Sequence, residues 1–93
     1  MCERKIEKEL VAQVKAMGGI APKFTSPGFD GLPERLVLLP SGRMAFVELK
    51  APGKKPRALQ MARHRLLRRL GFKVYVIDEI NQIDSVLEEI DHE

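Results

Sequence analysis

Two apolar runs on either side of a turn signal constrain the fold of this chain more than any other feature. Residues 35–39 and 44–49 are rich in Leu, Val and other apolar side chains, and residues 40–43 between them read Pro-Ser-Gly-Arg. Apolar runs that flank a turn containing Pro and Gly are typical of two antiparallel strands in a hairpin. The sequence therefore predicts a β-hairpin at the centre of the chain.

The segments outside the hairpin predict helices and two further strands. Helices are expected over residues 3–17, 57–70 and 82–90, and strands over residues 20–24 and 73–77. Because a long helix separates the hairpin from the last strand, that strand should join the sheet in parallel through a right-handed crossover. The predicted fold is α/β, in the order αβββαβα, with a small mixed sheet flanked by helices.

Length and composition bound the class of protein. The chain has 93 residues, of which 44% are hydrophobic and 31% charged, and this fits one small domain over residues 1–93 rather than a membrane protein. The one cysteine, Cys2, excludes an internal disulfide and a multi-cysteine zinc site. A reducing location inside the cell, such as the cytoplasm, is therefore expected.

Charge is distributed unevenly along the chain, whose formal net charge is +3. Residues 50–73 include many Lys and Arg but no Asp or Glu, whereas residues 78–93 include seven acidic residues and no Lys or Arg. A basic segment of this kind favours a face directed at a polyanion such as nucleic acid. Aromatic residues are few and fall mainly in predicted strands, so recognition of nucleic-acid shape is favoured over reading of base sequence.

Three charged residues of the hairpin are expected to meet at one end of it. Glu48 and Lys50 are two residues apart on one strand and therefore point to the same face, and Glu34 opens the facing strand. Two carboxylates a few ångströms apart repel one another unless a cation lies between them. Mg²⁺ and Mn²⁺ prefer such oxygen ligands, so the pattern predicts a site for metal-assisted phosphodiester hydrolysis.

Three segments of the hairpin and of the helix after it are similar to the motifs of one known family. They are Gly31-Leu32-Pro33-Glu34-Arg35, Phe46-Val47-Glu48-Leu49-Lys50-Ala51-Pro52-Gly53 and Leu59-Gln60, and together they resemble the VRR-NUC branch of the PD-(D/E)xK nuclease superfamily. The resemblance covers nearly the whole chain and is to the short stand-alone members of phage and bacteria. It implies a restriction-endonuclease-like αβββαβ core, Mg²⁺ or Mn²⁺ as cofactor, and homodimers that cleave four-way DNA junctions.

The resemblance also implies a metal site at the end of the hairpin. Glu34 and Glu48 would bind the metal ion together with the backbone carbonyl of Leu49. Lys50 would orient the attacking water or stabilise the negative charge that develops on the phosphate.

Two further positions carry family roles. The conserved glutamine of the family motif falls on Gln60, in the helix predicted over residues 57–70. The acidic residue of the first helix falls on Glu7. Glu3 lies one helical turn away on the same face, so it stays open as an alternative.

One position departs from the family pattern, because Glu34 stands where the family usually has Asp after the proline. The extra methylene shifts the carboxylate by about one bond, and a displacement near 1 Å lowers some enzymatic rates by about 10²-fold. Three interpretations are open. Glu34 binds the metal from a slightly displaced backbone, Asp30 in the preceding loop takes its place, or the site is weakened or inactive.

The basic helix supplies the candidate DNA contacts. Its inner face is expected to consist of Leu59, Ala62, Leu66, Leu67 and Leu70. Gln60, His64 and Arg68 recur every four residues beside that face, either as solvent-exposed positions without function or as contacts with DNA. Contacts with phosphates carry little sequence information, and the residues predicted to make them are Lys54, Lys55, Arg57, His64 and Arg68.

These observations together predict a metal-dependent DNA endonuclease that acts on branched DNA as a homodimer. A four-way junction presents two equivalent strands, which two sites related by a twofold axis would cut. Two alternatives stay open: a nuclease that processes flaps or ends, and a catalytically weakened DNA-binding module with the same fold.

Overall fold

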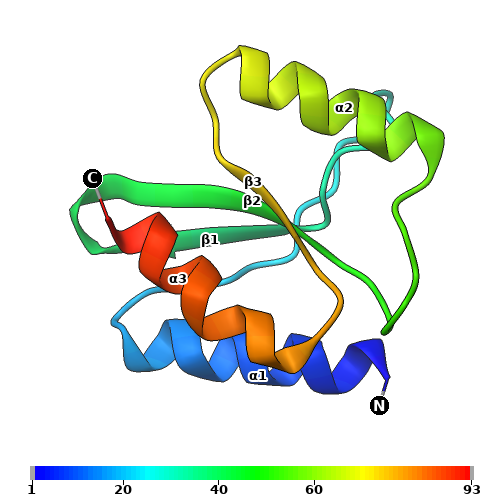
Figure 1. Ribbon diagram of the computed structural model, residues 1–93. Helices are drawn as coiled ribbons and strands as arrows, with labels where there is room; N and C mark the ends of the chain where they lie inside the picture. Colours follow the sequence, from blue (N-terminus) through cyan, green and yellow to red (C-terminus); the bar gives the residue numbers. More distant parts are fainter. Residues whose placement is uncertain (1, 93) are drawn as a thin grey trace.

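A three-stranded mixed sheet forms the centre of the computed structural model, which describes residues 2–92 (Figure 1). Its spatial order is β1-β2-β3, with strands β1 (Arg35–Leu39), β2 (Arg43–Leu49) and β3 (Val74–Ile77). β1 pairs antiparallel with β2 along its whole length, and β2 pairs in parallel with β3. The predicted hairpin and the parallel last strand are both confirmed.

Helices cover both faces of the sheet. α1 (Glu3–Ala16) and α3 (Ile83–Asp91) lie side by side on one face, and α2 (Ala58–Arg69) lies across the other (Figure 1). Two short 3-10 turns, η1 (Pro40–Gly42) and η2 (Ile80–Gln82), join β1 to β2 and precede α3. None of the helices in residues 2–92 has the length and apolar character needed to cross a membrane.

The hydrophobic core lies between the sheet and the layer formed by α1 and α3. Alternate residues of β1 are buried, as expected for a strand with one face toward a core. The apolar stripe of α1, formed by Ile6, Leu10 and Val14, is fully buried against them. Each such side chain contributes roughly 1.5–3 kcal/mol by leaving water. The opposite face of the sheet, beneath α2, is therefore free to hold polar side chains.

The prediction of a regular strand over residues 20–24 is wrong. The segment runs antiparallel beside β1 but forms only two isolated bridges, to Leu38 and Arg35. Pro22 lies between these bridges. Its carbonyl accepts a hydrogen bond from the Leu36 N–H at 3.1 Å, but its ring nitrogen has no hydrogen to donate in return. The proline thus interrupts the ladder, and the sheet keeps three regular strands.

Candidate active site

A carboxylate is fully buried on the face of the sheet beneath α2. Glu48 on β2 has no exposed surface. The register pairs Arg35 with Val47, and its extension by one residue places Glu34 opposite Glu48. Opposed residues of an antiparallel pair point to the same face of a sheet, and the two carboxyl groups interact. The expected meeting of these two residues is observed, with Glu34 on the exposed side.

Three side chains surround the Glu48 carboxylate. Lys50 Nζ lies 3.6 Å from Glu48 Oε2, and Gln60 Nε2 donates a 3.4 Å hydrogen bond to the same oxygen. His64 Nε2 lies 3.8 Å from Glu48 Oε1, beyond hydrogen-bond distance, and neither of these two buried atoms has a hydrogen-bond partner within residues 2–92. One carboxylate oxygen is thus held by two donors, while the other can accept a further ligand.

Burial and charge together raise the pKa of Glu48 to about 7. Removal from water is the largest cause, the Lys50 ammonium opposes it, and the Glu34 carboxyl adds to it through repulsion and hydrogen bonding. Glu48 therefore retains a proton for part of the time at neutral pH unless a positive charge approaches it. A carboxyl group with so large a shift, placed beside specific charged partners, is typical of a functional site.

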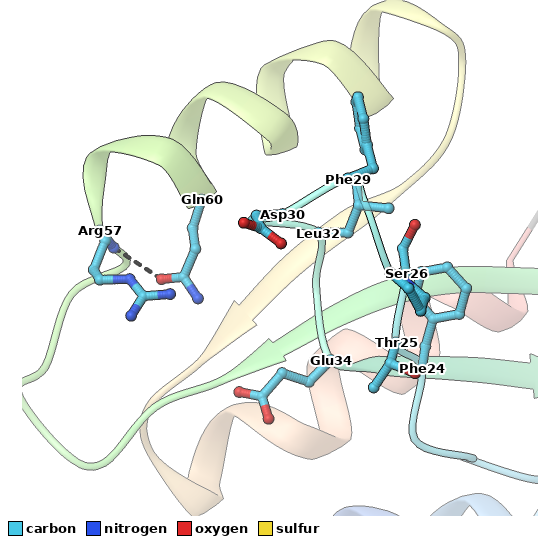
Figure 2. A pocket seen from close by; sticks show the side chains of 11 residues that line it. Phe24, Thr25, Ser26, Phe29, Asp30, Leu32, Glu34, Arg57 and Gln60 are labelled. Carbon is cyan, nitrogen blue, oxygen red and sulfur yellow. Dashed lines mark hydrogen bonds between the residues drawn. The ribbon is translucent and has the colours of Figure 1, made fainter.

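Gln60 links the first turn of α2 to the buried carboxylate. Its Oε1 atom accepts a 2.9 Å hydrogen bond from the Arg57 backbone N–H (Figure 2), and its Nε2 atom donates to Glu48. Because its acceptor and its donor each have a partner, the orientation of the amide is fixed. The motif glutamine is therefore placed beside the predicted metal ligand, as the sequence motif suggested.

The inner face of α2 differs from the one predicted. Gln60, His64 and Leu67 are its buried residues, whereas Leu59 and Leu70 are 46% and 63% exposed. The polar stripe faces inward because Glu48 lies beneath it, where it accepts a hydrogen bond from Gln60 and gives His64 a polar neighbour at 3.8 Å. The leucine spacing had indicated a face about one residue further round the helix.

The exposed position predicted for His64 is wrong, and with it the contact between His64 and DNA. Its side chain is 3% exposed and lies against Glu48. Burial lowers the pKa of His64, and the charges of Arg68 and Lys50 lower it further, so the ring is neutral at pH 7. A neutral, buried imidazole has no access to a phosphate, so the structure places His64 behind the site.

Glu7 lies on the other face of the sheet from Glu48. It forms an ion pair with Arg35, at 2.7 Å between Glu7 Oε2 and Arg35 Nη2, and this hydrogen bond is the main reason that the pKa of Glu7 is lowered. Arg35 is buried and also donates a hydrogen bond to the Ala21 carbonyl. The structure therefore brings Glu7 to Arg35 and not to the buried carboxylate, while Glu3 is exposed one turn away.

The remaining basic candidates lie around the N-terminal end of α2 and at its far end. Lys54, Lys55 and Arg57 are exposed and belong to the segment directly before α2, whose first turn carries Gln60. Arg68 is exposed as well, but its Nη2 atom donates a 2.8 Å hydrogen bond to the Val74 carbonyl and ties α2 to β3. The first three cations are thus the ones that lie free beside the site.

The donor atoms of this site fit a hard divalent cation. Glu34 and Glu48 offer carboxylate oxygens, and Glu48 Oε1 is buried without a hydrogen-bond partner. Leu49, whose carbonyl completes the predicted ligand set, is the next residue on β2. Among the described residues no three His, Cys, Asp or Glu side chains gather as a metal cluster. Such a small set of protein oxygens is common for Mg²⁺, which keeps several waters and binds substrate phosphates.

A cavity of about 360 Å³ adjoins the carboxylates, between the loop over residues 24–34 and the start of α2 (Figure 2). Glu34 and Gln60 belong to its lining, together with side chains that the sequence did not single out, chief among them Phe24, Thr25 and Ser26. In the sequence, only the Pro and Gly residues of this segment indicated that a loop without regular secondary structure lies here.

Asp30 lies in the same loop and extends toward Gln60 (Figure 2). Its side chain is exposed and lines the cavity rather than the buried part of the site. Of the two acidic residues considered for the second carboxylate, Glu34 is therefore the one whose charge acts on Glu48.

No family model matches the chain. "Putative nuclease p44" of Acyrthosiphon pisum secondary endosymbiont phage 1 is 51% identical over 85 residues, which cover 91% of this chain and 90% of the phage protein. A solved structure of a VRR_NUC domain matches with a TM-score of 0.86 and 33% sequence identity, over 92% of this chain and 94% of that one. Both likenesses span nearly the full length of both proteins rather than the site motifs alone. The chain therefore belongs to the VRR-NUC family of nuclease domains.

Proposed function

We propose that this chain is a DNA endonuclease that hydrolyses phosphodiester bonds with Mg²⁺ or Mn²⁺ bound by Glu34, Glu48 and the Leu49 carbonyl. The observation that carries the proposal is a buried carboxyl group with a pKa near 7 opposite a second carboxyl group on the neighbouring strand. A divalent cation relieves the repulsion between two such groups. When bound, the ion would polarise the phosphate and lower the pKa of a coordinated water.

Lys50 and Gln60 prepare the site for this reaction. Lys50 Nζ, 3.6 Å from Glu48 Oε2, is placed to stabilise negative charge that builds up on a phosphate at this edge of the sheet. Gln60 holds the same oxygen and is itself held by Arg57. The carboxylate is therefore oriented before substrate binds, which lowers the cost of reorganisation during the reaction.

The cations beside the site bind the DNA backbone. Lys54, Lys55 and Arg57 are exposed in the segment that leads into α2, and Arg57 lines the same cavity as Glu34, so phosphates held there would approach the carboxylates. Such contacts gain free energy from counterion release and do not read base sequence. An intracellular site of action follows from DNA as the substrate.

Branched DNA, and four-way junctions in particular, is the substrate class that we propose, with a homodimer as the active form. One site in a 93-residue chain cuts one strand at a time. Two copies related by a twofold axis would present two sites to the two equivalent strands of a junction. A closed symmetric dimer also encloses a substrate that one small domain only touches from one side.

A comparison of DNA structures tests this proposal. Labelled four-way junction, flap, duplex and single-stranded DNA are incubated with the protein in Mg²⁺, Mn²⁺ or EDTA, beside Glu48→Ala and the control Glu88→Ala, an exposed carboxylate on α3. We expect paired, symmetric, metal-dependent cuts in the junction, lost in Glu48→Ala and kept in Glu88→Ala. Cuts confined to the flap would replace the junction proposal with the flap alternative, and binding without cleavage would leave only a DNA-binding module.

Two substitutions at Glu34 decide which carboxylate binds the metal. Glu34→Asp should retain or raise cleavage, while Glu34→Ala should abolish it and weaken Mn²⁺ binding in a calorimetric titration. Undiminished cleavage by Glu34→Ala, together with loss in Asp30→Ala, would assign the metal to Asp30 instead. Sedimentation of the free protein and of its junction complex measures the oligomeric state separately.

A further inference from the structure

The cavity beside the carboxylates is continuous with the candidate active site. It is lined by Glu34 and Gln60, which belong to that site, and extends from them along the loop over residues 24–34 (Figure 2). We propose that this cavity receives one unpaired nucleobase, from the nucleotide next to the phosphodiester bond that is cut. The inference rests on the nuclease activity proposed above and specifies which DNA the site accepts.

The charges around the cavity do not favour a second phosphate as its occupant. Arg57 is the one Lys or Arg side chain among its described lining residues, whereas Asp30 and Glu34 both contribute carboxylates. Because the proposed metal ion occupies the Glu34 carboxylate, Arg57 and Asp30 balance one another in the rest of the lining, and no excess of positive charge remains there to hold a phosphate. The uncharged part of a nucleotide, its base, is the part that suits this lining.

The size and chemistry of the lining also fit a single base. A volume of about 360 Å³ lies at the lower end of the range for small-molecule sites, so the cavity admits one planar group and not a duplex. Phe24 and Leu32 give apolar surface, and Ser26 and Asp30 give polar groups along the same wall. The Asp30 carboxylate accepts hydrogen bonds, which the exocyclic amino groups of cytosine, adenine and guanine donate, whereas thymine has no exocyclic amino group and offers only its ring N3–H.

The wall that carries Asp30 is held rigidly against α2. Arg63 Nε donates a 2.8 Å hydrogen bond to the Asp30 carbonyl, and the Arg63 guanidinium lies 3.9 Å from the centre of the Phe29 ring. Gly31, with φ +93°, packs so closely on α2 that a Cβ atom there would come within 2.8 Å of Leu59 Cγ. A preformed wall of this kind loses little conformational entropy when it binds a ligand.

This cavity links the site to branched DNA by a physical argument. Removing a base from a duplex costs a few kcal/mol, and the cost is least where the base is already unpaired. Nucleotides at a branch point lose their pairing or stacking at lower cost than nucleotides within a continuous duplex, because a neighbour on one side is missing or displaced. If cleavage requires a base in this cavity, intact duplex is cut more slowly than branched DNA. No contact that recognises the branch itself is then needed.

The test varies the bases that flank the cut. After the cut has been mapped, cytosine, thymine or an abasic residue is placed unpaired at each flanking position of the same branched substrate, and single-turnover cleavage is measured. We expect cytosine to be cut about tenfold faster than thymine at one of the two positions, and the abasic substrate to be slowest. In Asp30→Ala the ratio of cytosine to thymine should fall to about one, whereas the control Asp84→Ala, an exposed carboxylate on α3, should keep it.

A second measurement separates this inference from the nuclease proposal. 2-Aminopurine, placed in turn at each nucleotide around the branch point, is expected to gain fluorescence at one position when wild-type protein binds the DNA in EDTA, because the base leaves its stack, and to gain less with Asp30→Ala. Equal rates for cytosine, thymine and abasic substrates would overturn the inference even if the enzyme cleaves DNA. A fluorescence gain that depends on Asp30, in a protein that cuts no substrate, would support the base cavity and reject the nuclease proposal.

Discussion

His64 Nε2 and Glu48 Oε1 face one another across 3.8 Å, and neither atom has a hydrogen-bond partner among residues 2–92. Both side chains are almost completely buried, with 3% and 0% of their surfaces exposed. An unsatisfied buried polar atom costs about 1–3 kcal/mol. The pair is therefore a costly arrangement in the absence of a ligand, and the cation proposed above would remove the cost at Glu48 Oε1.

Replacing His64 should weaken the metal site while the fold is kept. Mutation of a residue that contacts and orients a metal ligand typically lowers metal affinity 10- to 100-fold. We expect His64→Leu, which removes the polar neighbour of Glu48 Oε1, to lose about that much in Mn²⁺ affinity measured by calorimetry. His64→Gln retains a donor and should keep most of the affinity. Wild-type affinity in the leucine variant would contradict a role for this pair.

The burial of Glu48 predicts that the metal-free protein becomes less stable as pH rises. Its pKa is about 7 in the folded protein against an ordinary value of 4.5, so the folded state binds more protons between these values. The free energy of unfolding should then fall between about pH 4.5 and 7, by about 3 kcal/mol in all at 1.36 kcal/mol per pKa unit. Urea unfolding in EDTA measures this loss, and Glu48→Gln should remove it. The same pH dependence in both proteins would reject the raised pKa.

Removing the exposed cations beside the site should reduce the salt dependence of DNA binding. Each lost phosphate contact lowers the slope of log K against log salt by about 0.9 for duplex DNA. We expect the double variant Lys54→Ala, Lys55→Ala to lose roughly two such contacts in fluorescence anisotropy titrations without metal. The matched control is Lys8→Ala, Lys15→Ala, which removes two exposed cations from α1 on the other face of the sheet. An equal change of the salt slope in both double variants would show that DNA does not bind preferentially at Lys54 and Lys55.

Substitution of Gly31 should disturb the cavity wall. Gly31 and Gly28 both have positive φ, +93° and +82°, but a Cβ atom at Gly31 would meet Leu59 and Arg63, whereas at Gly28 it meets nothing within 4 Å. Backbone strain costs of order 1–3 kcal/mol in either alanine variant. Only Gly31→Ala should also abolish the preference for cytosine beside the cut. Urea unfolding and the cleavage ratio, measured together, separate strain from displacement of the wall.

The ion pair between Glu7 and Arg35 predicts a structural role for Glu7. Because Arg35 is buried, loss of its partner should lower the free energy of unfolding by about 1–2 kcal/mol in Glu7→Ala. Glu3→Ala, at an exposed position of the same helix, should change stability little. A large loss of cleavage by Glu7→Ala at unchanged stability would instead return Glu7 to the catalytic machinery that the family resemblance implies.

The approach of Glu34 to Glu48 was predictable from the sequence for a simple reason. A tight turn fixes which residues of two strands lie opposite one another, and strand residues alternate between faces. The position of two carboxylates relative to the turn therefore determines their proximity without knowledge of the rest of the fold.

The inner face of α2 was not predictable in the same way. Helical periodicity selects the apolar stripe, and the leucines of α2 offer one, yet Gln60 and His64 are the residues that face the sheet. Their burial depends on Glu48, which belongs to a different element, and a local pattern contains no information about that partner. The strand predicted over residues 20–24 failed for a different reason. The segment is extended as expected, but Pro22 lacks the backbone donor that a regular strand requires.

The segment over residues 20–24 also protects the molecule against unwanted association. It occupies the outer edge of β1, so this strand does not present a row of unpaired backbone groups to an incoming strand. A sheet with such an edge resists open-ended growth by strand addition on that side. Strand addition to this sheet would therefore have to use its other edge, which β3 forms.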